Sequence, residues 1–244
     1  MNKPYSILVT RELNDDQITL AEELELDVVV EPAIRIEYRH DWFAVETILK
    51  NTDQPIFAFT SQNGVIAFER FLKTRSGFSI PDPVYAVGTK TAEALSEIGI
   101  DARAPKQQDG AGLAQKIVED LSADSDLKDA TVLHFCGDKR RDEFRQFLQD
   151  SDVDVRDVVV YKTILNNMDI PQIPVEAILF FSPSAVQAYR NSGGFRNTQL
   201  PELFAIGSTT AEELSIETGK HVHISPEPST EALLTFTAQI LDET

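Results

Sequence analysis

Short apolar runs recur along the chain, and each is followed by a polar turn and by apolar residues at helical spacing. The longest runs have four or five residues, as at 177–181. Because they are hydrophobic without alternation, they are typical of parallel strands buried on both faces. Behind one turn, Val65, Phe68 and Leu72 share a helix face. The runs predicted as strands are 7–9, 56–59, 84–87, 132–135, 178–181 and 203–206.

This pattern occurs twice. Residues 59–65 (FTSQNGV) return about 120 positions later as 180–186 (FFSPSAV), and residues 87–95 return as 206–214. A third, looser pair joins 104–113 to 225–233. Alternating strands and helices in two copies predict an α/β fold: two similar domains with parallel sheets and helices on both faces.

Two extended, β-rich stretches interrupt the alternation, at 28–38 and 158–165. They are separated by nearly the repeat distance, and we interpret them as the connections between the domains. In that arrangement one domain is discontinuous (1–32 with 167–244) and the other continuous (40–157). Residues 33–39 and 158–166 are then the connecting strands. A plain tandem pair divided near residue 125 fits the repeat equally well.

The composition, net charge and cysteine count of the chain disfavour several classes of protein. The 244 residues are 42% hydrophobic and 25% charged, as in an ordinary globular protein and unlike a disordered or fibrous one. The net charge of −18 disfavours nucleic acid and anionic membranes as partners. No apolar run approaches the ~18 residues of a membrane span, and the N-terminal stretch lacks an export signal. With Cys136 as the only cysteine, a cytoplasmic location is expected.

The polar turns are the candidate site. In open α/β sheets, ligands bind beyond the carboxyl ends of the strands, where helix N-termini present free N–H groups to anions. Taken singly, each serine or threonine can simply cap its helix, and Thr209 with Glu212 has capping-box spacing. Taken together, the turns predict a cleft lined by donors. They are 60–64, 88–90, 137–139, 182–184, 207–210 and 228–230.

Other chemistry has weaker signals. Residues 110–112 (GAG) lack the third glycine of a dinucleotide fingerprint, and no phosphate-binding loop is present. His221 and His223 have no neighbouring ligand residues for a metal. His134 and Cys136, at a strand end, are interpreted as packing residues. Residues 139–141 (KRR) fit a solvated helix start and an anion contact equally well.

An ordered string of short motifs resembles the uroporphyrinogen-III synthase family over nearly the whole chain. The motifs are 7–11 (ILVTR), 59–61 with Val65, 86–92 (AVGTKTA), Gly137 with Arg141, 160–163 (VYKT), 181–184 (FSPS), 205–211 (AIGSTTA), and 225–226 leading to Ser229. The resemblance implies the discontinuous arrangement, with a two-stranded connection and an active site in the cleft between the domains.

The resemblance also implies an enzyme of tetrapyrrole and heme biosynthesis, a cyclising hydro-lyase without cofactor or metal. Its substrate would be the linear polycarboxylate hydroxymethylbilane. Loss of the terminal hydroxyl gives an azafulvene, and attack by the far ring gives a spiro intermediate. Fragmentation and reclosure then yield uroporphyrinogen III, with the last pyrrole inverted.

By resemblance, Tyr161 is the catalytic residue and assists departure of the hydroxyl as a proton donor. Without the family resemblance, a tyrosine in a connecting strand would be interpreted as a half-buried packing residue. The positions matched to substrate binding are Arg11, Ser61, Thr89, Lys90, Arg141, Ser182, Ser184, Thr209 and Thr210.

For partners, we expect the small-molecule substrate, transient contact with the preceding pathway enzyme, and a monomer. The alternative function is a non-catalytic cytoplasmic protein whose paired domains bind or sense an acidic metabolite. A nucleotide-dependent enzyme is disfavoured by the missing phosphate motifs.

Overall fold

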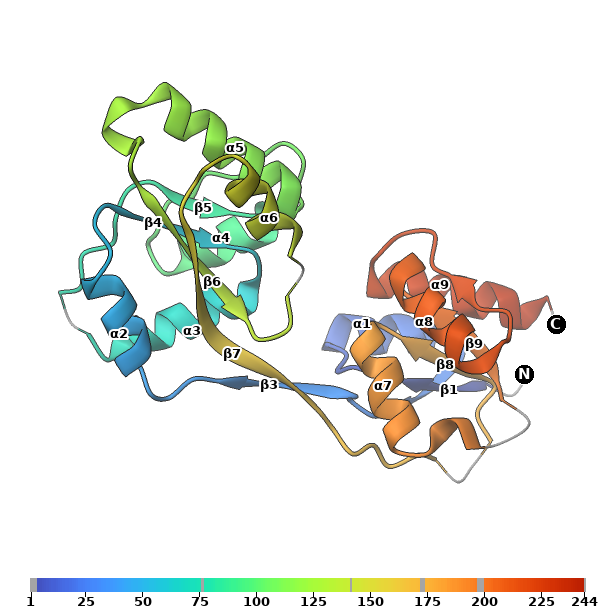
Figure 1. The fold of residues 1–244 in the computed structure, drawn as a ribbon. Helices are drawn as coiled ribbons and strands as arrows, with labels where there is room; N and C mark the ends of the chain where they lie inside the picture. The colour runs from blue at the N-terminus through green and yellow to red at the C-terminus, as the bar shows by residue number, and fades with distance from the viewer. Residues whose placement is uncertain (1–3, 76, 141, 172–173, 197–199, 244) are drawn as a thin grey trace. The chain divides into compact units, whose positions relative to one another are not determined.

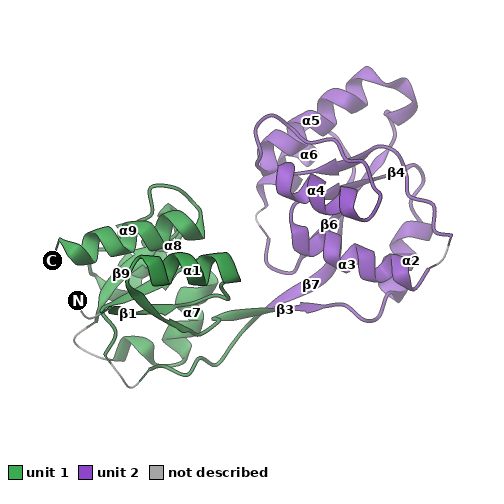
Figure 2. Ribbon diagram, turned by 180° about the vertical axis from the view of Figure 1, so that it is seen from behind, with its two compact units in different colours: residues 1–35, 164–244 green, residues 36–163 purple. Residues whose placement is uncertain are grey.

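The computed structural model describes residues 4–75, 77–140, 142–171, 174–196 and 200–243. The chain forms two compact units (Figure 2). Unit 1 comprises residues 1–35 and 164–244, and unit 2 comprises residues 36–163. Each unit is built around its own five-stranded sheet.

The sheet of unit 1 has the strand order β10-β9-β8-β1-β2, and all its neighbouring strands are parallel. Its middle strands contain almost only apolar residues, which are buried because helices cover both faces. The strands are β1 (Tyr5–Val9), β2 (Leu26–Val30), β8 (Ala177–Phe180), β9 (Glu202–Ala205) and β10 (His223–Ile224).

Two helices cover each face of this sheet. Ile7 and Val9 pack under α1 (Asp15–Glu23) and α9 (Thr230–Asp242). Leu8, which points to the other face, packs with α7 (Pro183–Asn191) and α8 (Ser208–Thr218). The alternation of side chains along one strand thus supplies two separate cores. A short 3-10 helix, η2 (Gly194–Arg196), follows α7.

The sheet of unit 2 has the order β3-β7-β6-β4-β5. Its strands are β3 (Ile34–Tyr38), β4 (Pro55–Phe59), β5 (Val84–Ala86), β6 (Thr131–Gly137) and β7 (Val155–Leu165). Strands β5, β4, β6 and β7 are parallel. β3 runs antiparallel to β7, since the Arg39 amide donates to the Val160 carbonyl and the Asn166 amide to the Ala33 carbonyl. β3 and β7 also carry the chain between the units.

Helices again cover both faces of this sheet (Figure 1). On one side, α2 (Phe43–Lys50), α3 (Gln62–Lys73) and α4 (Thr89–Glu97) bury an aromatic core in which the rings of Phe59 and Phe135 stack with centroids 4.9 Å apart. On the other side lie α5 (Gly110–Ala123) and α6 (Glu143–Asp150). A short 3-10 helix, η1 (Ser125–Leu127), follows α5. Within the described ranges, no helix has the length and apolarity that crossing a membrane requires.

The two units share one topology. Unit 1 contains the succession β8, α7, β9, α8, β10 and α9, and the segment β1-α1-β2 comes from the start of the chain. Unit 2 contains the corresponding succession β4, α3, β5, α4 and α5, and the segment β6-α6-β7 comes last. The position of β10 is taken by Arg103, which bridges to Tyr85. The sequence repeat therefore corresponds to a structural duplication.

The predicted α/β fold with helix-flanked parallel sheets is confirmed. All six predicted strand runs contain strands. The extended stretch 28–38 contains parts of two strands. It contains the end of β2, a break at residues 31–33, and then β3, and these two strands belong to different sheets. Pro32 lies in the break, where its missing N–H removes a ladder donor.

Replacing Gly64 by alanine tests the close packing of α3 on β6. A Cβ at Gly64 would lie 2.8 Å from the Phe135 carbonyl oxygen, so the helix must shift. We expect the free energy of unfolding to fall by about 2 kcal/mol in urea denaturation. Gly207→Ala is the control, because a Cβ there meets nothing within 4 Å, and it should cost less than about 1 kcal/mol. Equal losses would contradict the packing argument.

Candidate functional site

A pocket of about 400 Å³ lies at the carboxyl ends of the unit 2 strands. Its walls come from the turns after β4, β5 and β6, from β7, and from the starts of α5 and α6. Two of the residues matched by resemblance, Ser61 and Tyr161, line it, together with Thr60, His134 and Arg140. This is the place in an open α/β sheet where ligands are expected.

The side chain of Tyr161 is held from several sides. Its hydroxyl lies 3.0 Å from the Ser61 hydroxyl. Ser61 in turn caps α3 by accepting the Gly64 amide at 3.2 Å. The pairing of β6 with β7 shifts register between Cys136 and Gly137, which brings Gly137 opposite Tyr161. Glycine is required there, because a Cβ would lie 2.4 Å from the Tyr161 Cε2 atom.

Tyr161 keeps its proton at neutral pH. The residue is only 9% exposed, and burial raises the pKa of its phenol above the ordinary value, while the hydrogen bond with Ser61 acts in the opposite direction. The site therefore presents a protonated hydroxyl, fixed in orientation by Ser61, at the wall of the pocket.

A polar network that the sequence analysis did not predict lies behind the same wall. His134 is 2% exposed, and both its ring nitrogens are engaged. Nε2 lies 2.8 Å from the Thr60 hydroxyl, and Nδ1 lies 2.9 Å from Asp157 Oδ1. The other oxygen of Asp157 accepts from Arg140 at 2.6 Å and from Arg145 at 2.7 Å. The network joins the turn after β4 to β6, β7 and α6.

Charge compensation keeps Asp157 ionised. Burial alone would raise its pKa, but the hydrogen bond from His134 and the charges of His134, Arg140 and Arg145 lower the pKa to about 2. The neighbouring Cys136 behaves in the opposite way, since burial and the Asp157 charge raise the pKa of its thiol to about 12. Cys136 is therefore a protonated, unreactive thiol.

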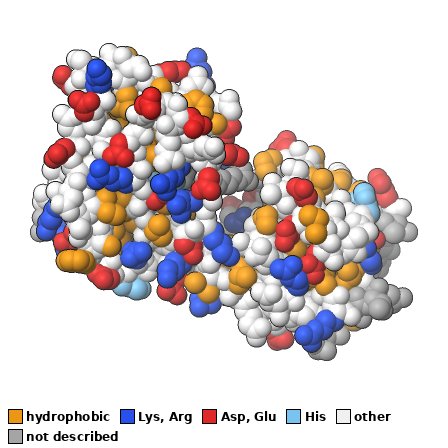
Figure 3. All heavy atoms as spheres, viewed as in Figure 1, with side chains coloured by type: hydrophobic (Ala, Val, Ile, Leu, Met, Phe, Trp, Pro, Cys, Tyr) orange, Lys and Arg blue, Asp and Glu red, His pale blue; other side chains and the backbone are white. Residues whose placement is uncertain are grey.

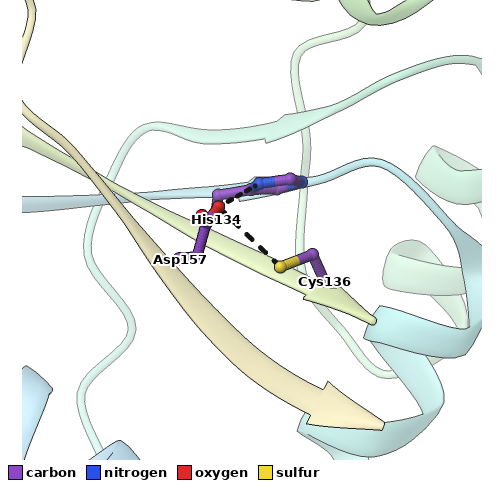
Figure 4. A group of neighbouring side chains, drawn as sticks. All are labelled: His134, Cys136 and Asp157. Atoms are coloured by element: carbon purple, nitrogen blue, oxygen red, sulfur yellow. Dashed lines mark hydrogen bonds and ion pairs between the residues drawn. The ribbon is translucent and has the colours of Figure 1, made fainter. Parts of the chain in front are cut away.

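By distance alone, this cluster resembles a metal site. His134, Cys136 and Asp157 place one ligand atom each within 4.8 Å of one another (Figure 4). However, both oxygens of Asp157 already accept hydrogen bonds from His134, Arg140 or Arg145. Two guanidinium groups at the carboxylate oppose a further cation. The geometry fits an ion-paired network better than a metal centre.

Thr89 and Lys90 begin α4, on the edge of unit 2 that also carries Ser61, and both are exposed. Thr89 exchanges two hydrogen bonds with the amide of Gln108. The Gln62 amide donates to the Lys90 carbonyl, which links the two turns. Among the described residues, the Arg140 Nε atom is the one buried side-chain nitrogen or oxygen without a hydrogen-bond partner.

The other matched residues that the structure describes lie in unit 1, after the neighbouring strands β1, β8 and β9. The Arg11 guanidinium lies 5.2 Å from the centroid of the Phe181 ring and donates to Thr230. Ser182 caps α7 by accepting the Ala185 amide, and Ser184 lies in the first turn of that helix. Thr209 is exposed in the first turn of α8, whereas Thr210 is buried. Arg141 lies outside the described residues.

The capping-box interpretation of Thr209 and Glu212 is wrong. The N-cap of α8 is Gly207, with no side-chain cap, and Thr209 is already inside the helix. The capping interpretation does hold for Ser61, Ser182 and Ser229, whose hydroxyls accept amides of their own helices. The packing interpretation of His134 was incomplete, because the ring also lies in the polar network.

Comparison with known proteins gives a consistent result. The family model described as uroporphyrinogen-III synthase HemD matches residues 15–235. A mutant uroporphyrinogen III synthase from the extremely thermophilic bacterium Thermus thermophilus shares the fold with a TM-score of 0.63 at 18% identity, covering 98% of this chain and 100% of that one. The enzyme from Helicobacter pylori gives a TM-score of 0.64 at 18% identity, with 97% and 99% covered. No curated protein sequence matches significantly.

Replacing Asp157 by asparagine tests the network. It leaves Arg140, Arg145 and the buried His134 without their shared carboxylate, so the free energy of unfolding at pH 7 should fall by about 3 kcal/mol. The low pKa of Asp157 stabilises the fold above the unfolded-state value near 4, and this stabilisation is lost as the pH falls towards 2. The difference between wild type and variant should therefore shrink by about 2 kcal/mol between about pH 5 and pH 2.

Asp154→Asn is the matched control, because that carboxylate is 55% exposed and pairs with an exposed arginine. Its cost in urea denaturation should stay below about 1 kcal/mol. A wild-type-to-Asp157→Asn difference that does not change with pH would show that Asp157 does not stabilise the fold as a carboxylate.

Proposed function

The chain belongs to the uroporphyrinogen-III synthase family, and from this premise we propose how its described residues carry out the reaction. The family cyclises hydroxymethylbilane to uroporphyrinogen III, with inversion of the last pyrrole ring and loss of water. The chain is accordingly a cyclising lyase of tetrapyrrole and heme biosynthesis that acts on a small polycarboxylate. No observation favours the alternative of a non-catalytic binding protein.

The observation that carries the residue assignment is the Tyr161–Ser61 pair at the pocket wall. The terminal hydroxyl of the bilane is a poor leaving group until it accepts a proton. The Tyr161 phenol keeps its proton at neutral pH, and Ser61 orients it. We assign Tyr161 as the donor that assists departure of this hydroxyl, within a reaction that needs no cofactor.

The substrate carboxylates need local donors. Each pyrrole carries an acetate and a propionate, whereas the protein has a net charge of −18. On the face in Figure 3, basic side chains are scattered among acidic ones. In unit 2, the turns bearing Ser61, Thr89 and Lys90 suit carboxylates. The other proposed contacts are Arg11, Arg141, Ser182, Ser184, Thr209 and Thr210.

Much of the catalysis is positional. The bilane also closes without an enzyme, to the isomer in which the last ring is not inverted. Binding energy must therefore hold the chain so that the substituted carbon of the far ring attacks the azafulvene. For this reason Tyr161 contributes only part of the rate. We further propose a monomer in the cytoplasm that takes its substrate in transient contact with the preceding enzyme.

The first experiment supplies purified protein with fresh hydroxymethylbilane, oxidises the products to porphyrins and separates the isomers. Wild type should give mainly isomer III. Tyr161→Phe should lower kcat by about 10- to 100-fold, because one proton donor is lost, while the thermal unfolding midpoint stays close to that of wild type.

Tyr189→Phe is the matched control, since Tyr189 is a buried tyrosine on α7 that packs against Phe180 and Phe195. Its kcat should remain within twofold of wild type. Isomer I alone, formed at the rate seen without protein, would overturn the proposed function. Unchanged turnover in Tyr161→Phe would remove only Tyr161 from the mechanism.

A further inference from the structure

Thr60, His134 and Asp157 form a chain of hydrogen bonds that ends at the pocket. The Thr60 hydroxyl lies 2.8 Å from His134 Nε2, and His134 Nδ1 lies 2.9 Å from Asp157. Thr60 and His134 both line the pocket, but Thr60 is half-buried whereas His134 is 2% exposed, and Asp157 lies behind them. A group in the pocket therefore reaches the imidazole through the Thr60 hydroxyl.

The direction of these hydrogen bonds follows from Asp157. An ionised carboxylate can only accept, so the hydrogen on the imidazole lies on Nδ1. Arg140 and Arg145, which donate to the other oxygen, hold the carboxylate in place. When the ring carries this one hydrogen, its lone pair lies on Nε2 and the Thr60 hydroxyl donates to it. This is the arrangement in which a hydroxyl passes a proton to a histidine that a carboxylate orients.

The duplication indicates that the fold does not require these polar residues. In unit 2, Ala58 of β4 pairs with His134, which pairs with Asp157. In unit 1, the equivalent Leu179 of β8 pairs with Val9, which pairs with Val30. The equivalent of Thr60, after the strand, is Phe181. Apolar residues therefore fill the same positions in the sister sheet.

The proton balance of the reaction requires an acceptor as well as a donor. At the start, the C–O bond of the substrate breaks and the hydroxyl leaves as water with an added proton. At the end, the pyrrole carbon that forms the closing C–C bond loses its hydrogen as a proton. Tyr161 supplies the first proton under the proposed function, and a second group must accept the last one.

We infer that Thr60, with His134 behind it, is the proton acceptor for the closing step. The substrate carbon gives its proton to the Thr60 oxygen while the Thr60 proton moves to His134 Nε2. Asp157 stabilises the imidazolium that forms. The proton then returns through Thr60 and the pocket to the Tyr161 phenolate, so one turnover releases water and no net proton. Thr60 is the residue that meets substrate, and His134 and Asp157 are positioning residues. This role rests on the proposed function.

Steady-state kinetics with the porphyrin isomer assay test the role of the hydroxyl. Thr60→Val keeps the shape of the side chain and removes the hydroxyl. We expect kcat to fall about tenfold or more with KM nearly unchanged, and Thr60→Ser to restore kcat to within about threefold. Thr131→Val is the control. It removes a buried hydroxyl that also bonds to an aspartate, at the opposite end of the same strand β6, and its kcat should stay within twofold.

A measurement on the wild-type protein keeps the proposal testable if Thr60→Val does not fold. The ¹⁵N chemical shifts of the histidine rings give the tautomer of His134, identified by the signals lost in His134→Gln. We expect the neutral ring to carry its hydrogen on Nδ1. A neutral ring with the hydrogen on Nε2 would overturn the inference.

The outcomes separate the two proposals. Isomer III from wild type, with kcat of Thr60→Val within twofold, overturns the acceptor role and leaves the proposed function intact. A rise in KM alone also overturns it, because Thr60 would then only bind substrate. Isomer I alone from wild type refutes the proposed function, and the acceptor role with it.

Discussion

Burial of each sheet on both faces is the constraint on which the rest of the structure depends. The inner strands have helices above and below them, so their side chains are apolar and their backbone groups are used in the ladders. Polar side chains are thereby largely confined to the carboxyl ends of the strands, where a short turn leads into the next helix. Ser61, Thr89, Ser182 and Thr209 all lie at such ends.

The network around His134 departs from this constraint and explains several of its neighbours. A polar ring that is almost fully buried within a strand must have partners for both nitrogens. Thr60, directly after β4, and Asp157 of β7 supply them from either side of β6. The carboxylate then needs its own compensation, which Arg140 and Arg145 provide. One buried histidine thus determines four further polar residues, and it places them behind the wall that also holds Tyr161.

Much of the fold could be predicted from the sequence, since buried parallel strands leave uninterrupted apolar runs and the duplication leaves a repeat. The pairing partners of β2 and β3 could not, because which sheet a strand joins depends on distant segments. Tyr161 was assigned only through family resemblance. The hydroxyl that contacts it, that of Ser61, lies 100 residues earlier in the chain. His134 was missed for the same reason, as Asp157 and Thr60 come from other strands. A comparison of His134 and Thr60 with their counterparts in the other copy, Val9 and Phe181, could have indicated that these two residues are unusual.

The duplication distinguishes residues that the fold needs from residues that serve the site. Equivalent helices keep equivalent N-caps: Ser61 matches Ser182, and Gly88 matches Gly207. The Ser61 and Ser182 hydroxyls each accept an amide that a helix start leaves unpaired, so both units retain a serine there. The Thr60–His134–Asp157 group has only apolar counterparts, although a buried polar network costs desolvation that apolar packing avoids. A desolvation cost that only one copy carries is not explained by the stability of the fold. Because the group lies beside Tyr161, we infer that it serves the chemistry of the pocket.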